Sequence, residues 1–140
     1  MNAVVLYESL TGNTRRAAEL IGEALSNEGV STTVCPVTAP DHQALALADL
    51  VVVGTWTDGI FVFAQRPARA DRLHDIPPIT GKRCAVFVTF ALNPGKSLEK
   101  LTAIMEERGA EVLGGVAIRR DHLDEGARDF VDRVLGAVNA

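Results

Sequence analysis

Two short runs of continuously apolar residues restrict the folds open to this chain more than any other feature. Leu50 to Val53 has the sequence Leu-Val-Val-Val, and Ala85 to Val88 has the sequence Ala-Val-Phe-Val. A strand with apolar side chains on both of its faces is typical of a parallel sheet that helices cover on both sides. Parallel neighbours need a crossover connection, which is usually a helix. The sequence should therefore alternate between strand-like and helix-like segments.

The chain shows this alternation along its whole length. Ala17, Leu20, Ile21, Ala24 and Leu25, for example, recur at the three- and four-residue spacing of a helix with one apolar face. Strands are expected at residues 3–7, 30–37, 50–54, 83–89 and 110–119, and helices at 14–25, 41–48, near 66–73, 97–108 and 125–138. Because parallel crossovers are right-handed, the most economical fold is an α/β doubly wound five-stranded parallel sheet of order 2-1-3-4-5 with helices on both faces. At 140 residues we expect one domain, 1–140.

Composition and charge exclude several classes of function. A net charge of -4 leaves no basic surface of the kind that binds nucleic acid. The apolar runs are far shorter than the roughly 20 residues of a membrane-spanning helix, so we expect a cytoplasmic protein without a membrane segment. Cys35 and Cys84 lie in separate strand-like runs with no nearby ligand, and we expect free thiols and no metal.

The loop after the first expected strand has the composition of an anion site. It carries three hydroxyl side chains and one glycine and leads directly into a helix; its residues are Ser9, Leu10, Thr11, Gly12, Asn13 and Thr14. Backbone N–H groups and the helix dipole supply positive potential there, and Gly12 lets the backbone approach a phosphate closely. The loop lacks the lysine of a nucleoside-triphosphate loop. The alternative is an ordinary helix capped by a threonine.

Two further segments should meet this loop, because ligands of doubly wound sheets lie beyond the carboxyl ends of the strands where the winding reverses. The segment after the third strand contains the sole tryptophan, and its candidate cofactor-binding residues are Thr55, Trp56, Thr57, Asp58 and Gly59. The segment after the fourth strand contributes Thr89, Phe90, Ala91, Leu92, Asn93 and Gly95. The Trp56 indole offers a wide face to a flat ring. Alternatively it packs in a local core or a subunit contact, and Phe90 is equally well explained as a core residue.

The first loop resembles the FMN-phosphate loop of the flavodoxin family, whose pattern is Ser or Thr, any residue, Thr, Gly, any residue and Thr. Residues 9–14 match every defining position. The resemblance extends in element order over nearly the whole chain, and it implies a flavodoxin-like fold of the short-chain type with FMN as the cofactor. It also implies that Trp56 lies against the isoalloxazine ring. The third segment departs from the family because it has no Tyr, so Phe90 or Leu92 would have to cover the outer ring face.

The resemblance implies an FMN flavoprotein that shuttles electrons between a reductase and an acceptor enzyme, without a catalytic side chain. Arg15, Arg16, Arg66 and Arg69 are candidates for a rim that steers an acidic redox partner. One alternative is an FMN oxidoreductase that reduces a small acceptor such as a quinone, and another is a flavin-free binding or regulatory module. We expect a monomer, with a dimer as the alternative.

Overall fold

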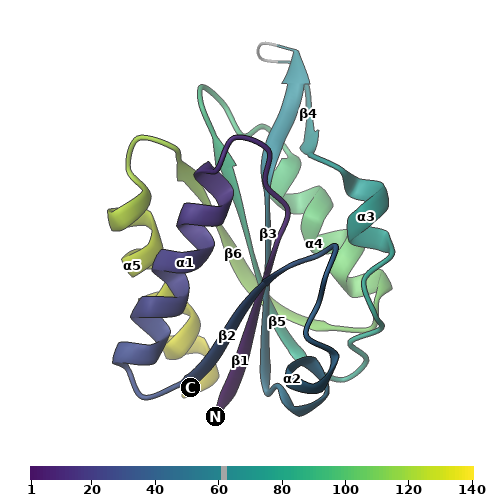
Figure 1. Ribbon diagram of the computed structural model, residues 1–140. Helices are drawn as coiled ribbons and strands as arrows, with labels where there is room; N and C mark the ends of the chain where they lie inside the picture. Colours follow the sequence, from purple (N-terminus) through teal and green to yellow (C-terminus); the bar gives the residue numbers. More distant parts are fainter. Residues whose placement is uncertain (61–62) are drawn as a thin grey trace.

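A computed structural model describes residues 1–60 and 63–140, which form one sheet flanked by helices (Figure 1). Five strands run parallel in the order β2-β1-β3-β5-β6, and β4 pairs with β3 in the antiparallel direction. The strands are β1 (Asn2–Tyr7), β2 (Ser31–Pro36), β3 (Leu50–Ile60), β4 (Phe63–Pro67), β5 (Arg83–Phe90) and β6 (Glu111–Arg119). The predicted order 2-1-3-4-5 is confirmed for the five parallel strands.

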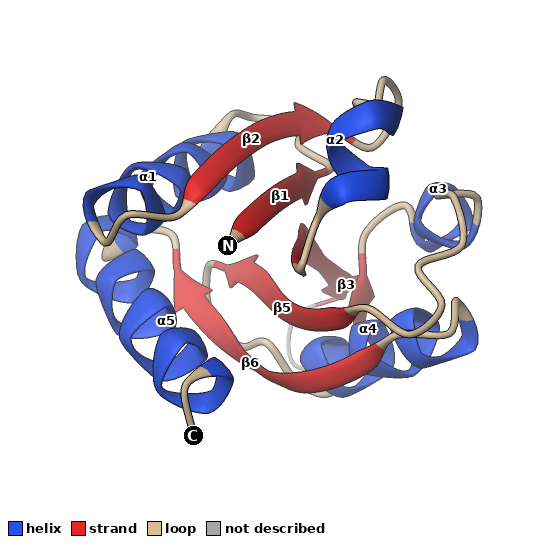
Figure 2. Ribbon diagram, turned by 90° about the horizontal axis from the view of Figure 1, so that it is seen from below, coloured by secondary structure: helices blue, strands red, loops and turns tan. Residues whose placement is uncertain are grey.

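Helices cover both faces of the sheet (Figure 2). They are α1 (Asn13–Asn27), α2 (His42–Leu47), α3 (Ala70–His74), α4 (Ser97–Glu107) and α5 (Leu123–Val138). The helices α1 and α5 lie on one face, and α2, α3 and α4 lie on the other. The first face contains the edge-to-face pair Phe87 and Phe130, whose ring centroids are 5.9 Å apart, and the second contains Met105. Residues 50–53 and 85–88 are 0% exposed, as burial on both faces requires.

The region after Gly54 corrects the sequence-based prediction. We expected the third strand to end there and a helix near 66–73, but β3 continues through all the candidate residues from Thr55 to Gly59, β4 reaches Pro67, and the helix is confined to the short α3. These candidates therefore lie in a strand rather than in a loop. Threonine and tryptophan favour extended structure, and Pro67 is excluded from a helix interior, so the local sequence is compatible with the antiparallel pairing of β3 with β4.

The carboxyl ends of β1 and β5 lie at the same edge of the parallel sheet, beside Gly54 to Trp56 in the middle of β3. A Cβ atom on Gly54 would lie 2.0 Å from the ring of Phe87, so only glycine allows β3 and this ring to pack so closely. Directly after β1, the N–H of Glu8 donates to the Gly54 carbonyl at 3.0 Å. The segments that follow β1 and β5 are thus held beside the part of β3 that continues after Gly54.

Candidate functional site

The loop between β1 and α1 presents a helix N-terminus at this edge. Gly12 precedes α1 in the left-handed region, with φ of 97°, which a residue with a Cβ rarely adopts. The Ser9 hydroxyl oxygen accepts from the N–H groups of Gly12 and Arg15 at 3.2 and 3.3 Å. The N–H groups of Asn13 and Thr14 belong to the first helical turn, where the helix offers them no carbonyl. This end of α1 therefore presents main-chain donors and the positive end of the helix dipole to an anion.

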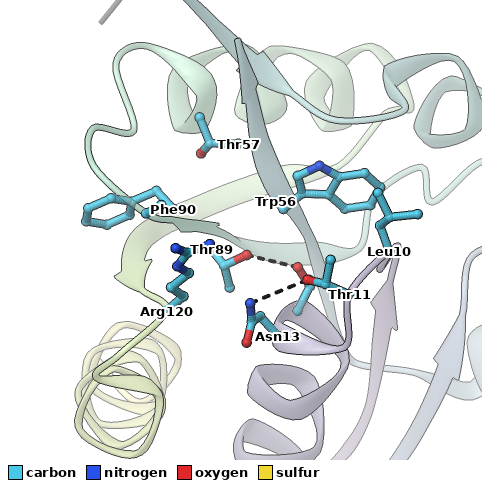
Figure 3. A pocket seen from close by; sticks show the side chains of 10 residues that line it. Leu10, Thr11, Asn13, Trp56, Thr57, Thr89, Phe90 and Arg120 are labelled. Atoms are coloured by element: carbon cyan, nitrogen blue, oxygen red, sulfur yellow. Dashed lines mark hydrogen bonds between the residues drawn. The ribbon is translucent and has the colours of Figure 1, made fainter. Parts of the chain in front are cut away.

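Side-chain hydroxyl groups extend this set of donors (Figure 3). Thr14 Oγ1 and Thr89 Oγ1 lie 2.9 Å apart, and the two residues are only 1% and 2% exposed. Asn13 Nδ2 donates to Thr11 Oγ1 at 3.4 Å. The bond between Thr14 and Thr89 joins the first loop to β5, so it holds the N-terminus of α1 in place against the sheet.

Trp56 forms one side of the pocket from within β3. Its side chain lies beside Leu10, while Phe90 and Arg120 lie on the opposite side, with the hydroxyl groups between them (Figure 3). The indole is half-buried. An aromatic wall therefore faces a pocket whose base is polar.

Two hydroxyl groups connect this wall to the third segment. Thr57 Oγ1 lies 2.9 Å from Ser97 Oγ, and Ser97 donates to the Pro94 carbonyl at 2.6 Å. Because the Ser97 proton is used in the second bond, Thr57 is the donor in the first. Ser97 is buried. The connection holds residues 91–96 against β3.

The third segment contributes less to the pocket than the sequence predicted. Phe90 lines the pocket, but Leu92 points outward with 83% of its surface exposed. The Asn93 side-chain oxygen accepts from the Gly95 N–H at 2.9 Å, so this side chain closes a turn within the loop. Gly95 has φ of 52°, and a Cβ on it would lie 2.6 Å from Cβ of Gln65, so the loop packs directly against β4.

One pocket brings together residues from all three predicted segments. The predicted residues that line it are Leu10, Thr11, Asn13, Thr14, Trp56, Thr57, Thr89, Phe90 and Ala91. Its described lining does not include Ser9, Gly12, Thr55, Asp58, Gly59, Leu92, Asn93 or Gly95. Thr55 is fully buried and donates to the Ala68 carbonyl at 3.0 Å. Asp58 forms a 3.8 Å ion pair with Arg66.

Arg120 also lines the pocket, and the sequence patterns do not predict it. It follows β6, and its N–H donates to the Phe90 carbonyl at 2.9 Å. A position just beyond the carboxyl end of a parallel strand is the signal that could have indicated it. Its guanidinium adds a positive charge on the side of the pocket opposite Trp56 (Figure 3).

The two cysteines lie in the core, away from this pocket. Both are free thiols, as predicted. Burial raises the pKa of Cys84 to about 12 and also raises the pKa of Cys35, so both thiols stay protonated at neutral pH.

Within residues 1–60 and 63–140 no three His, Cys, Asp or Glu side chains are grouped as metal ligands. In the same ranges no helix has the length and apolar character needed to cross a membrane.

The fold and the pocket define a class of protein, in which a doubly wound sheet presents a helix N-terminus and an aromatic wall to one ligand. Residues 4–133 match a family model described as a flavodoxin domain. The chain is 24% identical over 128 residues to the flavodoxin of Clostridium beijerinckii, a match that covers 91% of this chain and 93% of the relative. The chain therefore belongs to the flavodoxin family.

Solved flavodoxin structures share the fold. Oxidised flavodoxin 1 from Bacillus cereus superposes with a TM-score of 0.71 at 21% identity, covering 96% of this chain and 98% of that one. A variant of the flavodoxin from Pseudomonas aeruginosa gives a TM-score of 0.74 at 16% identity, and the match covers 100% of both chains.

Flavodoxins bind FMN, so FMN is the cofactor of this chain, and the chain is an electron-transfer flavoprotein. This result argues against the alternative of a flavin-free binding or regulatory module. The pocket fits this cofactor by the chemistry of its donors. Hydroxyl groups and first-turn N–H groups suit a phosphate, and the Trp56 indole suits a flat aromatic ring. FMN supplies the redox chemistry when bound, and the protein supplies its position and its shielding from water.

Proposed function

We propose that this protein carries electrons between a reductase and an acceptor enzyme, with FMN held in the pocket beside the carboxyl ends of β1 and β5 and residues 56–57 of β3. The proposal rests on one observation, which is that the same pocket is lined by residues far apart in the sequence, namely Thr14, Trp56 and Thr89. The described lining contains no Asp, Glu, His or Cys side chain. No group that titrates near neutral pH faces the pocket from these residues, which suits a carrier better than an enzyme that transfers protons to a substrate.

The phosphate would bind at the N-terminus of α1. The hydroxyl groups of Thr11 and Thr14 and the main-chain N–H groups of the first turn are donors there. The isoalloxazine ring would pack between Trp56 and the opposite side of the pocket. Leu10 is 66% exposed beside Trp56, so a ring bound there would remove apolar surface of Leu10 from water.

We further propose that the partner docks through an acidic surface. Arg15 and Arg16, in the first turn of α1, share Glu19 as their ion-pair partner, so this group keeps a net positive charge. Their side chains are 65% and 53% exposed. Arg120 adds a further positive charge at the pocket. These charges would steer an acidic protein toward the cofactor edge, although the chain as a whole carries -4.

Calorimetric titration of the apoprotein with FMN and with riboflavin tests the binding site. We expect one FMN per chain and much weaker binding of riboflavin, because riboflavin lacks the phosphate. Trp56→Leu should lower the affinity for both ligands by a similar factor. Leu47→Ala, at an exposed position of α2, is the control and should change neither affinity. Equal affinities of the unmodified protein for FMN and riboflavin would show that the phosphate does not bind at α1.

Stopped-flow reduction of the FMN-loaded protein by an acidic ferredoxin tests the partner surface. The rate should fall as NaCl is raised, because salt screens attraction between exposed charges. Arg15→Gln should lower the rate at low salt, with Arg128→Gln, on α5, as the control. A rate that does not change with salt would contradict electrostatic steering.

The modest net charge of -4 and a third segment without Tyr favour a second candidate, an oxidoreductase that reduces a small acceptor such as a quinone. The two functions are separated by a turnover assay. A carrier should reduce its acceptor with a nicotinamide nucleotide only after a reductase is added. Steady quinone reduction without a reductase would identify the protein as an oxidoreductase.

A further inference from the structure

A buried carboxylate lies directly before the phosphate-type loop. Only 5% of the Glu8 side chain is exposed, and its Oε1 accepts from Nη1 of Arg69 at 2.6 Å and from Nη1 of Arg72 at 2.9 Å. The other carboxylate oxygen, Oε2, is buried and has no hydrogen-bond partner among the described residues. Burial of a charge is costly unless partners compensate it, so the two guanidinium groups are needed to keep this carboxylate in place.

Arg69 connects this carboxylate to the aromatic wall. Its guanidinium carbon lies 5.3 Å from the centroid of the Trp56 ring, within the range of a cation–π interaction. Arg69 has φ of 51°, and it is the only residue other than glycine with a positive φ in the described ranges. Such a backbone conformation persists only where the surrounding contacts hold it. The Arg69 carbonyl accepts from the N–H groups of Arg72 and Leu73, and its side chain lies between Glu8 and the indole.

We propose that Arg69 is a positioning residue, which Glu8 holds over the Trp56 ring so that the indole stays in place as the wall of the FMN pocket. Trp56 lines the pocket and Arg69 is not part of its described lining, so Arg69 acts on the cofactor through the indole. Glu8 immediately precedes Ser9, and the ion pair therefore couples the wall to the phosphate-type loop. The inference rests on the proposed role of Trp56 in FMN binding.

Arg72 provides a matched control. It bonds the same carboxylate oxygen as Arg69, but the structure places only Arg69 over the Trp56 ring. Arg72→Gln therefore removes one charge and one hydrogen bond to Glu8 and leaves the ring contact intact. Arg69→Gln removes the ring contact as well, whereas Arg69→Lys keeps a positive charge on this side chain.

Because Trp56 is the sole tryptophan, fluorescence of the apoprotein reports its environment directly. Arg69→Gln should increase quenching of Trp56 fluorescence by acrylamide, because the indole loses the group that covers it. Arg69→Lys should restore most of the protection, and Arg72→Gln should resemble the unmodified protein. Glu8→Gln should act in the same direction as Arg69→Gln, since it releases the guanidinium. Unchanged quenching in Arg69→Gln would overturn the proposal.

Ligand titrations locate the effect in the pocket. Arg69→Gln should weaken the binding of FMN and the binding of riboflavin by the same factor, because it disturbs the aromatic wall and leaves the phosphate site unchanged. The strength of a cation–π contact corresponds to a factor of roughly threefold to tenfold in affinity. A loss restricted to FMN would overturn the proposal by placing the effect at the phosphate. If the unmodified protein bound neither flavin, the proposed function would fail, whereas the fluorescence of the apoprotein would still decide whether Arg69 holds Trp56.

Discussion

The hydrogen bond between Thr14 and Thr89 is a sensitive point at which to test the site. It joins the first turn of α1 to the end of β5, and both residues are almost fully buried. Thr14→Val or Thr89→Val keeps the shape of the side chain but leaves the remaining hydroxyl without its partner. The double variant replaces both hydroxyl groups by methyl groups, so neither position keeps a hydroxyl group that has lost its hydrogen-bond partner.

The expected magnitudes follow from burial. An unsatisfied buried hydroxyl costs about 1–3 kcal/mol, whereas removal of both partners is nearly neutral. For 140 residues, an unfolding entropy of about 2.1 cal/mol/K per residue gives about 0.3 kcal/mol per degree. Each single variant should therefore lower the Tm of the apoprotein by about 3–10 °C, and the double variant should lose much less than the sum.

Urea unfolding of the apoprotein, followed by circular dichroism, measures the free energy of unfolding for all four proteins in this cycle. We expect a coupling free energy of at least about 1 kcal/mol between the two positions. If the two single losses instead added to within about 0.5 kcal/mol, the two hydroxyl groups would not act as a pair, and the attachment of the first loop to β5 would need another cause.

Three further predictions concern the core and the third segment. Between pH 9 and pH 11 the free energy of unfolding should fall more steeply for the unmodified protein than for Cys84→Ala, by up to about 1.4 kcal/mol per pH unit. The reason is that the Cys84 thiol ionises near its ordinary pKa of 9.0 in the unfolded chain but keeps its proton in the folded one, where its pKa is raised to about 12. Equal slopes in urea titrations at several pH values would contradict this. Gly95→Ala should destabilise the protein by about 1–3 kcal/mol, since its Cβ would collide with Gln65 in addition to straining the backbone. Gly81→Ala, at φ of 77° with open space around it, is the control for strain alone and should cost about 1 kcal/mol, so equal losses would exclude the collision. Ser97→Ala should cost about 1–2 kcal/mol by leaving the Thr57 hydroxyl unpaired, while the Pro94 carbonyl keeps its bond from the Ser97 main-chain N–H, and Thr57→Val combined with it should add little.

Local sequence patterns were sufficient to predict the parallel sheet. The runs at residues 50–53 and 85–88 show two-sided burial by composition alone, and the spacing of Ala17, Ile21 and Leu25 places one face of α1 against the sheet. Strand order followed from the right-handed crossover rule rather than from any single residue. The residues from Ser9 to Thr14 indicated a phosphate loop because the donors of such a loop are adjacent in the chain.

The strand β3 exceeded its predicted length for a different reason. Apolar residues mark where a strand is buried, and this signal ends at Gly54. The polar continuation through Thr57 is extended because β5 pairs with its first two residues and β4 pairs with Thr57, as the registers of Trp56 with Thr89 and of Thr57 with Pro67 show. The Thr57 hydroxyl also bonds Ser97, which is 40 residues away. Neither contact leaves a periodic signal in the sequence.

The sequence by itself determined the five parallel strands, most of the helices and the edge of the sheet at which we propose that FMN binds, because the patterns that indicate them lie within short segments of the chain. Only the tertiary structure decided which side chains meet there: Arg120 joins the pocket from β6, and Glu8 reaches Arg69 across a separation of 61 residues. The position of a charged side chain in such a cluster depends on the packing of separate elements against one another. No local pattern of residue types records that packing.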